Sequence, residues 1–134
     1  MRKDHHQLPK KIQEEGFDFH WDNEKVWILD IPTEEVNVSE IDWVFDLPFW
    51  SFGGHKYNLN PREVLADIDS YPEHKERILN ANTSFPIDLM QNQSGRWLII
   101  DGLHRFARLF LEGNKKVQAR KIPRTFIPLI EKSS

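Results

Sequence analysis

The sequence predicts a small α+β fold, in which helices pack on a small mixed β-sheet, and patterns in the second half of the chain predict it. Residues 85–90 (FPIDLM) and 97–100 (WLII) are apolar runs joined by a polar turn with a glycine, which is typical of a β-hairpin. An Asp-Gly turn follows the second run. After it come an amphipathic helix over 104–112 and an alternating strand over 117–122. Strands and a helix thus follow one another within one short stretch, as an α+β fold requires.

Size and composition predict a single folded unit. The 134 residues fall within the usual size of one domain, and 39% of them are hydrophobic, which is enough to form a core. We assign residues 1–16 to a polar N-terminal arm and residues 17–134 to a single domain.

The absence of cysteine excludes disulfides, thiolate catalysis and cysteine-based metal sites. No run reaches the roughly 18 apolar residues of a membrane span, and the polar N-terminus does not fit a secretory signal, so we expect a cytoplasmic protein without membrane contact.

The first half of the chain is rich in apolar and aromatic side chains. Residues 26–31 (VWILDI) precede Pro32 and predict a strand, and the alternation at the start of residues 36–41 predicts a second one. Five aromatic residues follow within residues 43–52. We interpret these aromatic residues as core, with an adenine-stacking wall or a dimer surface as the alternative.

Helix signals are clearest from residue 60 onward. A helix is expected to start at Pro61, because proline is favoured at the first helical position. A second helix over residues 73–80 is expected to bury Ile78 and Leu79. Gly113 is well placed to end the amphipathic helix that precedes it.

Charge is distributed unevenly along the chain. Residues 1–54 contain 5 Lys/Arg against 12 Asp/Glu, whereas residues 55–134 contain 13 against 9. The formal net charge of −3 does not favour non-specific binding to DNA. The basic segment indicates either a solvated helix face or a local anion site, and the sequence leaves open whether the two halves pair within one molecule or between two. Its cations are Arg96, Arg105, Arg108, Lys115, Lys116, Arg120, Lys121 and Arg124.

The turn between strand 97–100 and the helix after it is the most informative segment. Gly102 makes the turn sterically easy, and the first amides of the helix are free to bind an anion. An arginine in that first turn, Arg105, opposes the helix dipole unless an anion is bound. The alternative is structural: Asp101 caps the helix, Gly102 forms the turn, and Arg105 pairs with a carboxylate.

Residues 101–105 (Asp-Gly-Leu-His-Arg) resemble the D-G-x-H-R signature of the ParB/sulfiredoxin-like superfamily. Other segments are similar to further family motifs, and the resemblance covers roughly residues 26–123. These segments are residues 36–41 for an early strand, Asn60-Pro61-Arg62 for the first box, residues 85–89 for the "PI-x-V" strand, and residues 117–122 for the strand after the motif helix.

The resemblance implies a ParB/sulfiredoxin-like fold that binds nucleotide phosphates over the motif loop. Sulfiredoxin has its catalytic cysteine where this chain has Leu103, so sulfiredoxin chemistry is not expected. Partition proteins carry a helix-turn-helix domain after this one, whereas only about ten residues follow Pro123 here, so classical partition-site binding is not expected either. Kinase-like members use additional acidic residues, for which Asp30, Glu34, Glu35 and Asp46 are candidates.

The working hypothesis is a nucleotide-binding domain that uses ATP, ADP or CTP, with phosphoryl transfer or nucleotide hydrolysis as the possible reaction. Asp101 and His104 are the catalytic candidates, and Asp101 would also bind Mg²⁺, because hard cations prefer carboxylate and phosphate oxygens. His104 and Arg105 would neutralise charge in the transition state, and Arg62 would reach the same anion. The phosphate-binding candidates are Gly102, Leu103, His104, Arg105 and Arg62.

Three classes of function stay open on the sequence alone. The first is an enzyme that transfers phosphate from a nucleotide to a small hydroxyl compound or to water. The second is a nucleotide-sensing interaction module without turnover. The third is a ParB-like nuclease, or a DNA-associated accessory protein that uses the basic face of residues 96–124. The sequence does not fix the oligomeric state.

Overall fold

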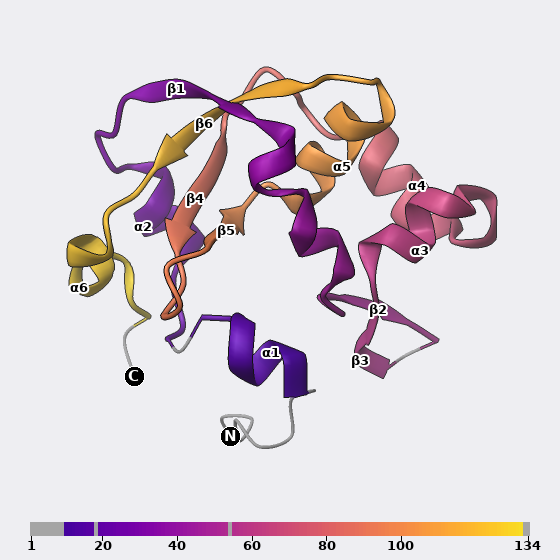
Figure 1. Cartoon of the computed structure of the whole chain (residues 1–134), viewed down its shortest axis with the longest axis horizontal. Coiled ribbons are helices and arrows are strands. Elements are labelled where there is room, and N and C mark those ends of the chain that lie inside the picture. Colours follow the sequence, from indigo (N-terminus) through magenta and orange to yellow (C-terminus); the bar gives the residue numbers. More distant parts are fainter. Residues whose placement is uncertain (1–9, 18, 54, 133–134) are drawn as a thin grey trace.

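The computed structural model describes residues 10–17, 19–53 and 55–132, and it confirms the α+β class (Figure 1). A four-stranded sheet has the order β1-β6-β4-β5, and β2 and β3 form a separate two-stranded sheet. The strands are β1 (Thr33–Asn37), β2 (Trp50–Phe52), β3 (His55–Leu59), β4 (Ile87–Gln91), β5 (Trp97–Asp101) and β6 (Lys116–Lys121). The helices are α1 (Lys10–Glu15), α2 (Asn23–Trp27), α3 (Pro61–Ala66), α4 (Pro72–Leu79), α5 (Leu103–Leu111) and α6 (Ile127–Ile130), with 3₁₀ turns between several of them.

The main sheet is mixed, as the sequence predicted. β4 and β5 form the expected antiparallel hairpin, β6 runs parallel to β4, and β1 closes the far edge antiparallel to β6. Asp88 on β4 is the register partner of both Asp101 on β5 and Arg120 on β6. Since register partners on neighbouring strands project from the same face of a sheet, three charged side chains form one row across it.

Two hydrophobic clusters pack against the main sheet. Ile87 and Leu89 of β4 belong to the larger cluster, which also contains buried apolar residues of α3, α4 and α5. Met90, the next residue along β4, belongs to the smaller cluster, with Val26 of α2 and Ile130 of α6. The division of β4 side chains between the clusters explains why residues 87–90 are all buried, Asp88 included.

The predicted helices of the second half are confirmed, with one error. Gly113 follows α5 with a φ of 83°, and its amide donates to the carbonyl of Phe110 at 3.0 Å, so it caps the helix as expected. The prediction for Leu79 was wrong, because 52% of this residue is exposed. The buried face of α4 carries His74 and Ile78, four residues apart, and the helical rotation of one further residue turns Leu79 outward.

The prediction of a strand over residues 26–31 was wrong. The segment starts as the short helix α2, because the side chain of Asp22 accepts a hydrogen bond from the amide of Glu24 and caps its N-terminus. Only Val26 of this apolar run is buried, and Ile28 is 82% exposed. The second predicted strand is present as β1, although it begins earlier and gives way to a 3₁₀ turn at Val38.

The described part of the predicted arm packs on the rest of the chain. Residues 1–9 lie outside the described residues. Residues 10–15 form α1, and Ile12 is buried in the larger hydrophobic cluster. None of the helices within the described ranges is long and apolar enough to cross a membrane.

Acidic and basic side chains pair within this chain. Four exposed or half-exposed ion pairs connect the acidic first half to cations further along the sequence, and such pairs each contribute about 0–1 kcal/mol. Arg108 pairs with Glu112 and also donates to the carbonyls of Leu79 and Ala81 at the end of α4. The four ion pairs are Glu15–Arg96, Glu34–Lys121, Glu35–Lys116 and Asp46–Arg62.

Replacement of Arg120 by alanine tests the buried ion pair between Arg120 and Asp88, which belong to the row of charged side chains across the sheet. We expect Arg120→Ala to lower the free energy of unfolding by about 3–5 kcal/mol, because it leaves the buried carboxylate of Asp88 without its partner. Lys116→Ala on the same strand is the control, since the Lys116–Glu35 pair is exposed and its loss should cost about 1 kcal/mol or less. Urea denaturation followed by circular dichroism measures both, and equal losses would contradict a structural role for Arg120.

Candidate functional site

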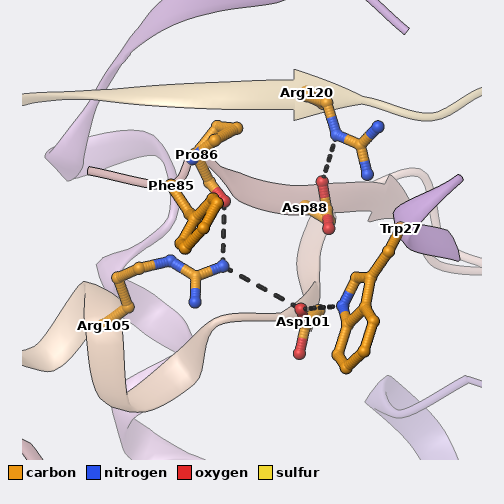
Figure 2. Close-up of a pocket in the computed structure, with 7 residues that line it drawn as sticks. All are labelled: Trp27, Phe85, Pro86, Asp88, Asp101, Arg105 and Arg120. Atoms are coloured by element: carbon orange, nitrogen blue, oxygen red, sulfur yellow. Dashed lines mark hydrogen bonds and ion pairs between the residues drawn. The ribbon is translucent and has the colours of Figure 1, made fainter. Parts of the chain in front are cut away.

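A cavity of about 490 Å³ opens beside the charged row, between α2, the start of β4 and the start of α5. Its volume lies within the range of small-molecule sites. Figure 2 shows the carboxylates of Asp88 and Asp101 and the guanidinium of Arg105 around the same space. The lining residues are Trp27, Phe85, Pro86, Asp88, Asp101, Arg105 and Arg120.

All three guanidinium nitrogens of Arg120 donate hydrogen bonds within the protein, which leaves few donors for a ligand. Its Nε donates to Asp88 Oδ1 at 2.6 Å, and its two terminal nitrogens donate to the carbonyls of Leu29 and Val26 at 2.8 and 3.0 Å. These carbonyls belong to the end of α2 and the residues after it. Arg120 therefore fixes α2 on the sheet, which makes its role structural.

The two carboxylates of the row differ in burial. Only 3% of Asp88 is exposed, and burial raises the pKa of its carboxyl above the ordinary value, with a smaller contribution in the same direction from Asp101 and an opposing one from Arg120. Asp101 is half-buried, and its Oδ2 accepts a hydrogen bond from the indole Nε1 of Trp27 at 2.8 Å. Each carboxylate is thus held at one oxygen by a partner from outside its own hairpin.

Arg105 reaches the cavity by crossing Gly102. Its Nη2 donates to the carbonyl of Pro86 at 2.9 Å and lies 3.9 Å from Asp101 Oδ2. A Cβ on Gly102 would lie 3.0 Å from Arg105 Nη2 and 3.1 Å from Ile87 Cγ2. Gly102 also has a φ of 105°, in the left-handed region that other residues rarely adopt. The glycine is therefore needed for both the turn and the path of the arginine.

Arg105 also has a donor that the fold does not use. Among the buried side-chain nitrogen and oxygen atoms of the described residues, its Nε alone has no hydrogen-bond partner. A buried donor without a partner costs about 1–3 kcal/mol, and more when the group is charged. Arg105 lines the cavity, so a ligand that draws its guanidinium inward would give this donor an acceptor.

The structure places His104 away from this cavity, contrary to the sequence hypothesis. Its ring stacks on Trp50 with 4.3 Å between centroids, and its Nε2 lies 3.1 Å from Nδ1 of His74. Because a carbonyl can only accept, His74 Nε2 donates to the carbonyl of Ser51 at 2.9 Å, so His74 Nδ1 accepts the proton of His104 Nε2. Burial, with smaller contributions from Arg77 and His74, lowers the pKa of His104 to about 3. The neutral ring therefore brings no positive charge to a phosphate.

Residues of the motif loop, 101–105, line two different cavities. Gly102 and Leu103 line a second cavity of about 370 Å³, together with residues of β5 and aromatic residues such as Phe49 and Tyr57. Asp101 lines both cavities, whereas Arg105 lines only the first. Gly102 and Leu103 at the start of α5 and Arg105, which the sequence hypothesis combined in one site, thus line different cavities.

Arg62 is not brought to the motif loop. It lines neither of these two cavities, and its Nη2 donates to Asp46 Oδ2 at 3.2 Å and to the carbonyl of Asp42 at 3.1 Å. The hydrogen bond to Asp46 raises the pKa of its guanidinium above the ordinary value. Of the proposed site residues, the structure brings Asp101 and Arg105 together.

The sequence hypothesis missed five of the seven residues that line the cavity of about 490 Å³, namely Trp27, Phe85, Pro86, Asp88 and Arg120. Asp88 had a usable signal, since it is a single carboxylate inside an otherwise apolar strand. Arg120 had a weaker one, as a charged residue in an alternating strand. Trp27 and Phe85 had none, because an isolated apolar residue carries no sign of its exposure.

Comparison with known proteins does not assign the chain to a family. No protein-family model matches it, and no curated protein matches it in sequence. Within the described ranges there is no group of three or more His, Cys, Asp or Glu side chains that could hold a metal ion.

Replacement of Gly102 by alanine tests whether the Arg105 side chain needs the space above this glycine. We expect Gly102→Ala to lower the free energy of unfolding by about 1–3 kcal/mol through backbone strain, and further through contact with the guanidinium. Gly95→Ala is the control, because Gly95 has a φ of 84° but nothing within 4 Å of its added Cβ. Denaturant titration should find the larger loss at Gly102, and equal losses would contradict the close approach.

The histidine pair predicts a dependence of stability on pH. Unfolded His104 takes up a proton below its ordinary pKa of 6.5, whereas the folded ring stays neutral down to about 3. The free energy of unfolding should therefore fall as the pH is lowered through this range, by up to about 1.4 kcal/mol per pH unit. His104→Gln should show a shallower decline in denaturant titrations between pH 6.5 and 4, while exposed His20→Gln should follow the unmodified chain. Identical slopes for all three proteins would refute this origin.

Proposed function

We propose that the chain binds a nucleotide through its phosphates, with Arg105 as the phosphate-binding residue. The observation that carries the proposal is the buried, unpartnered Nε of Arg105 beside a cavity of about 490 Å³. Guanidinium hydrogen bonds to phosphate oxygens are charge-assisted and among the strongest in proteins. A phosphate in the cavity that drew the guanidinium toward it would supply the acceptor that this buried donor lacks. The resemblance of residues 101–105 to the ParB/sulfiredoxin-like motif supports the same ligand, and a cytoplasmic location would fit it.

The charges around the cavity support a nucleotide that arrives with Mg²⁺. The lining contains two carboxylates and two guanidinium groups, so a free polyanion would meet Asp88 and Asp101 without a net positive field. Mg²⁺ is commonly bound by one or two carboxylates together with substrate phosphates. Asp101 and Asp88 would hold the ion here, and the ion would supply the charge neutralisation that lets phosphate lie beside them.

Binding is better supported than turnover. The sequence hypothesis gave His104 a catalytic role, but the neutral ring is committed to Trp50 and His74 and does not line the cavity. Transfer to a small hydroxyl compound or to water would thus depend on Asp101 alone among the catalytic candidates. A nucleotide-binding module is the function that the geometry favours.

The cations of the basic segment, residues 96–124, are largely paired within the chain, which favours a small ligand over DNA. Arg96, Lys116 and Lys121 form ion pairs with carboxylates of this chain. Arg120 is buried against Asp88, and Arg108 is used near the end of α4. Few of these cations thus remain for a phosphate backbone, which requires a continuous positive surface.

Calorimetric titration with Mg·ATP, Mg·ADP and Mg·CTP tests the proposal. At least one nucleotide should bind in the micromolar range, and Arg105→Ala should weaken it roughly 10- to 100-fold, as the loss of a charged hydrogen bond implies. Arg105→Lys should recover only part of the affinity, because lysine lacks the planar fork. Omission of Mg²⁺ should also weaken binding.

Lys115→Ala is the matched control for loss of one positive charge, since Lys115 is exposed and does not line this cavity. It should bind like the unmodified chain. Binding that is unchanged in Arg105→Ala would move the site elsewhere. No binding of any nucleotide by the folded protein would reject the proposed function.

A further inference from the structure

Trp27 contributes an exposed indole to the lining of the cavity of about 490 Å³. It is 58% exposed, yet its Nε1 donates to Asp101 Oδ2 at 2.8 Å. Phe85, from a distant part of the chain, is 61% exposed and lines the same cavity. Figure 2 shows the two rings on different sides of the space between Asp101 and Arg105. Exposed aromatic side chains that line the same cavity indicate a binding surface, whereas scattered ones do not.

The backbone that carries Trp27 is firmly held, although the ring is exposed. Arg120 donates to the carbonyl of Val26, the preceding residue, and to that of Leu29, two residues after Trp27. Val26 itself is fully buried, and Lys25 Nζ donates to the carbonyl of Glu131 at 2.9 Å. The ring is thus presented by a fixed segment, so a ligand that stacks on it would pay little for ordering it.

We propose that Trp27 is a specificity-determining residue of this site, which stacks on the base of the nucleotide and holds the Asp101 carboxylate through its indole N–H. The inference rests on the proposed function, since the phosphates must lie near Arg105. The ring supplies the preference for nucleotides over phosphate compounds that lack an aromatic base. The N–H fixes the orientation of a carboxylate that faces the phosphates and their cation.

The two contributions of Trp27 can be separated by two variants. Trp27→Phe keeps an aromatic ring and removes the N–H, whereas Trp27→Ala removes both. The loss of base stacking should weaken nucleotide binding about 10- to 100-fold. Inorganic pyrophosphate with Mg²⁺ has no base, so its affinity depends on Arg105 and Asp101 but not on stacking.

The experiment measures the dissociation constants of Mg·ATP, or of whichever of the three nucleotides binds most tightly, and of Mg·pyrophosphate for the full chain and each variant. We expect Trp27→Ala to reduce the preference for the nucleotide over pyrophosphate about 10-fold or more. Trp27→Phe should retain most of this preference, while both variants weaken pyrophosphate binding by the same factor through Asp101. Ile28→Ala should change neither affinity, because Ile28 is 82% exposed on the same segment and does not line the cavity.

Failure of this inference differs from failure of the proposed function. An unchanged preference in Trp27→Ala, with nucleotide binding still sensitive to Arg105→Ala, would overturn the role of Trp27 and leave the phosphate site intact. No nucleotide binding by the unmodified chain would reject both. Thermal unfolding of each variant shows whether the fold is retained. If Trp27→Ala does not fold, a Trp27→Phe variant that loses the preference overturns the inference, and one that retains it supports the ring.

Discussion

The buried ion pair between Asp88 and Arg120 is the interaction on which the candidate site depends. It joins two neighbouring parallel strands, and the remaining donors of Arg120 bind the carbonyls of Val26 and Leu29. A buried guanidinium is tolerated only when its hydrogen bonds are satisfied. The two carbonyls at and after the end of α2 accept those that Asp88 does not. The same contacts fix the segment that carries Trp27, so a pair in the sheet determines one wall of the cavity.

The other wall depends on the absence of a side chain at Gly102. The guanidinium of Arg105 passes over this glycine to the carbonyl of Pro86, and Asp101 precedes it at the end of β5. Asp101 therefore stands where the two walls meet, with the indole of Trp27 on one side and Arg105 on the other. The site combines a helix fixed from the sheet with an arginine fixed by a turn, and both constraints are independent of a ligand.

The parts of the fold that the sequence predicted are those with local causes. The hairpin, the helix after it and its glycine cap follow from patterns within a few residues. The helix α2 has a local cap in Asp22, but its end and the residues after it are held by Arg120, more than 90 residues away in sequence, and the apolar run by itself indicates neither contact. The position of His104 was missed because its partners, Trp50 and His74, come from other elements. The motif found Asp101 and Arg105, but tertiary contacts decide which cavity each of them faces.

The most direct test of the account is the NMR signal of the Arg105 Nε–H, assigned by its loss in Arg105→Lys, during titration with a magnesium nucleotide. The account predicts that this signal shifts on binding, because a phosphate oxygen becomes the acceptor that the buried donor lacks. A nucleotide that binds while the Arg105 signal stays unchanged would place the ligand elsewhere. The unpartnered donor would then be a cost of the fold rather than a part of its function.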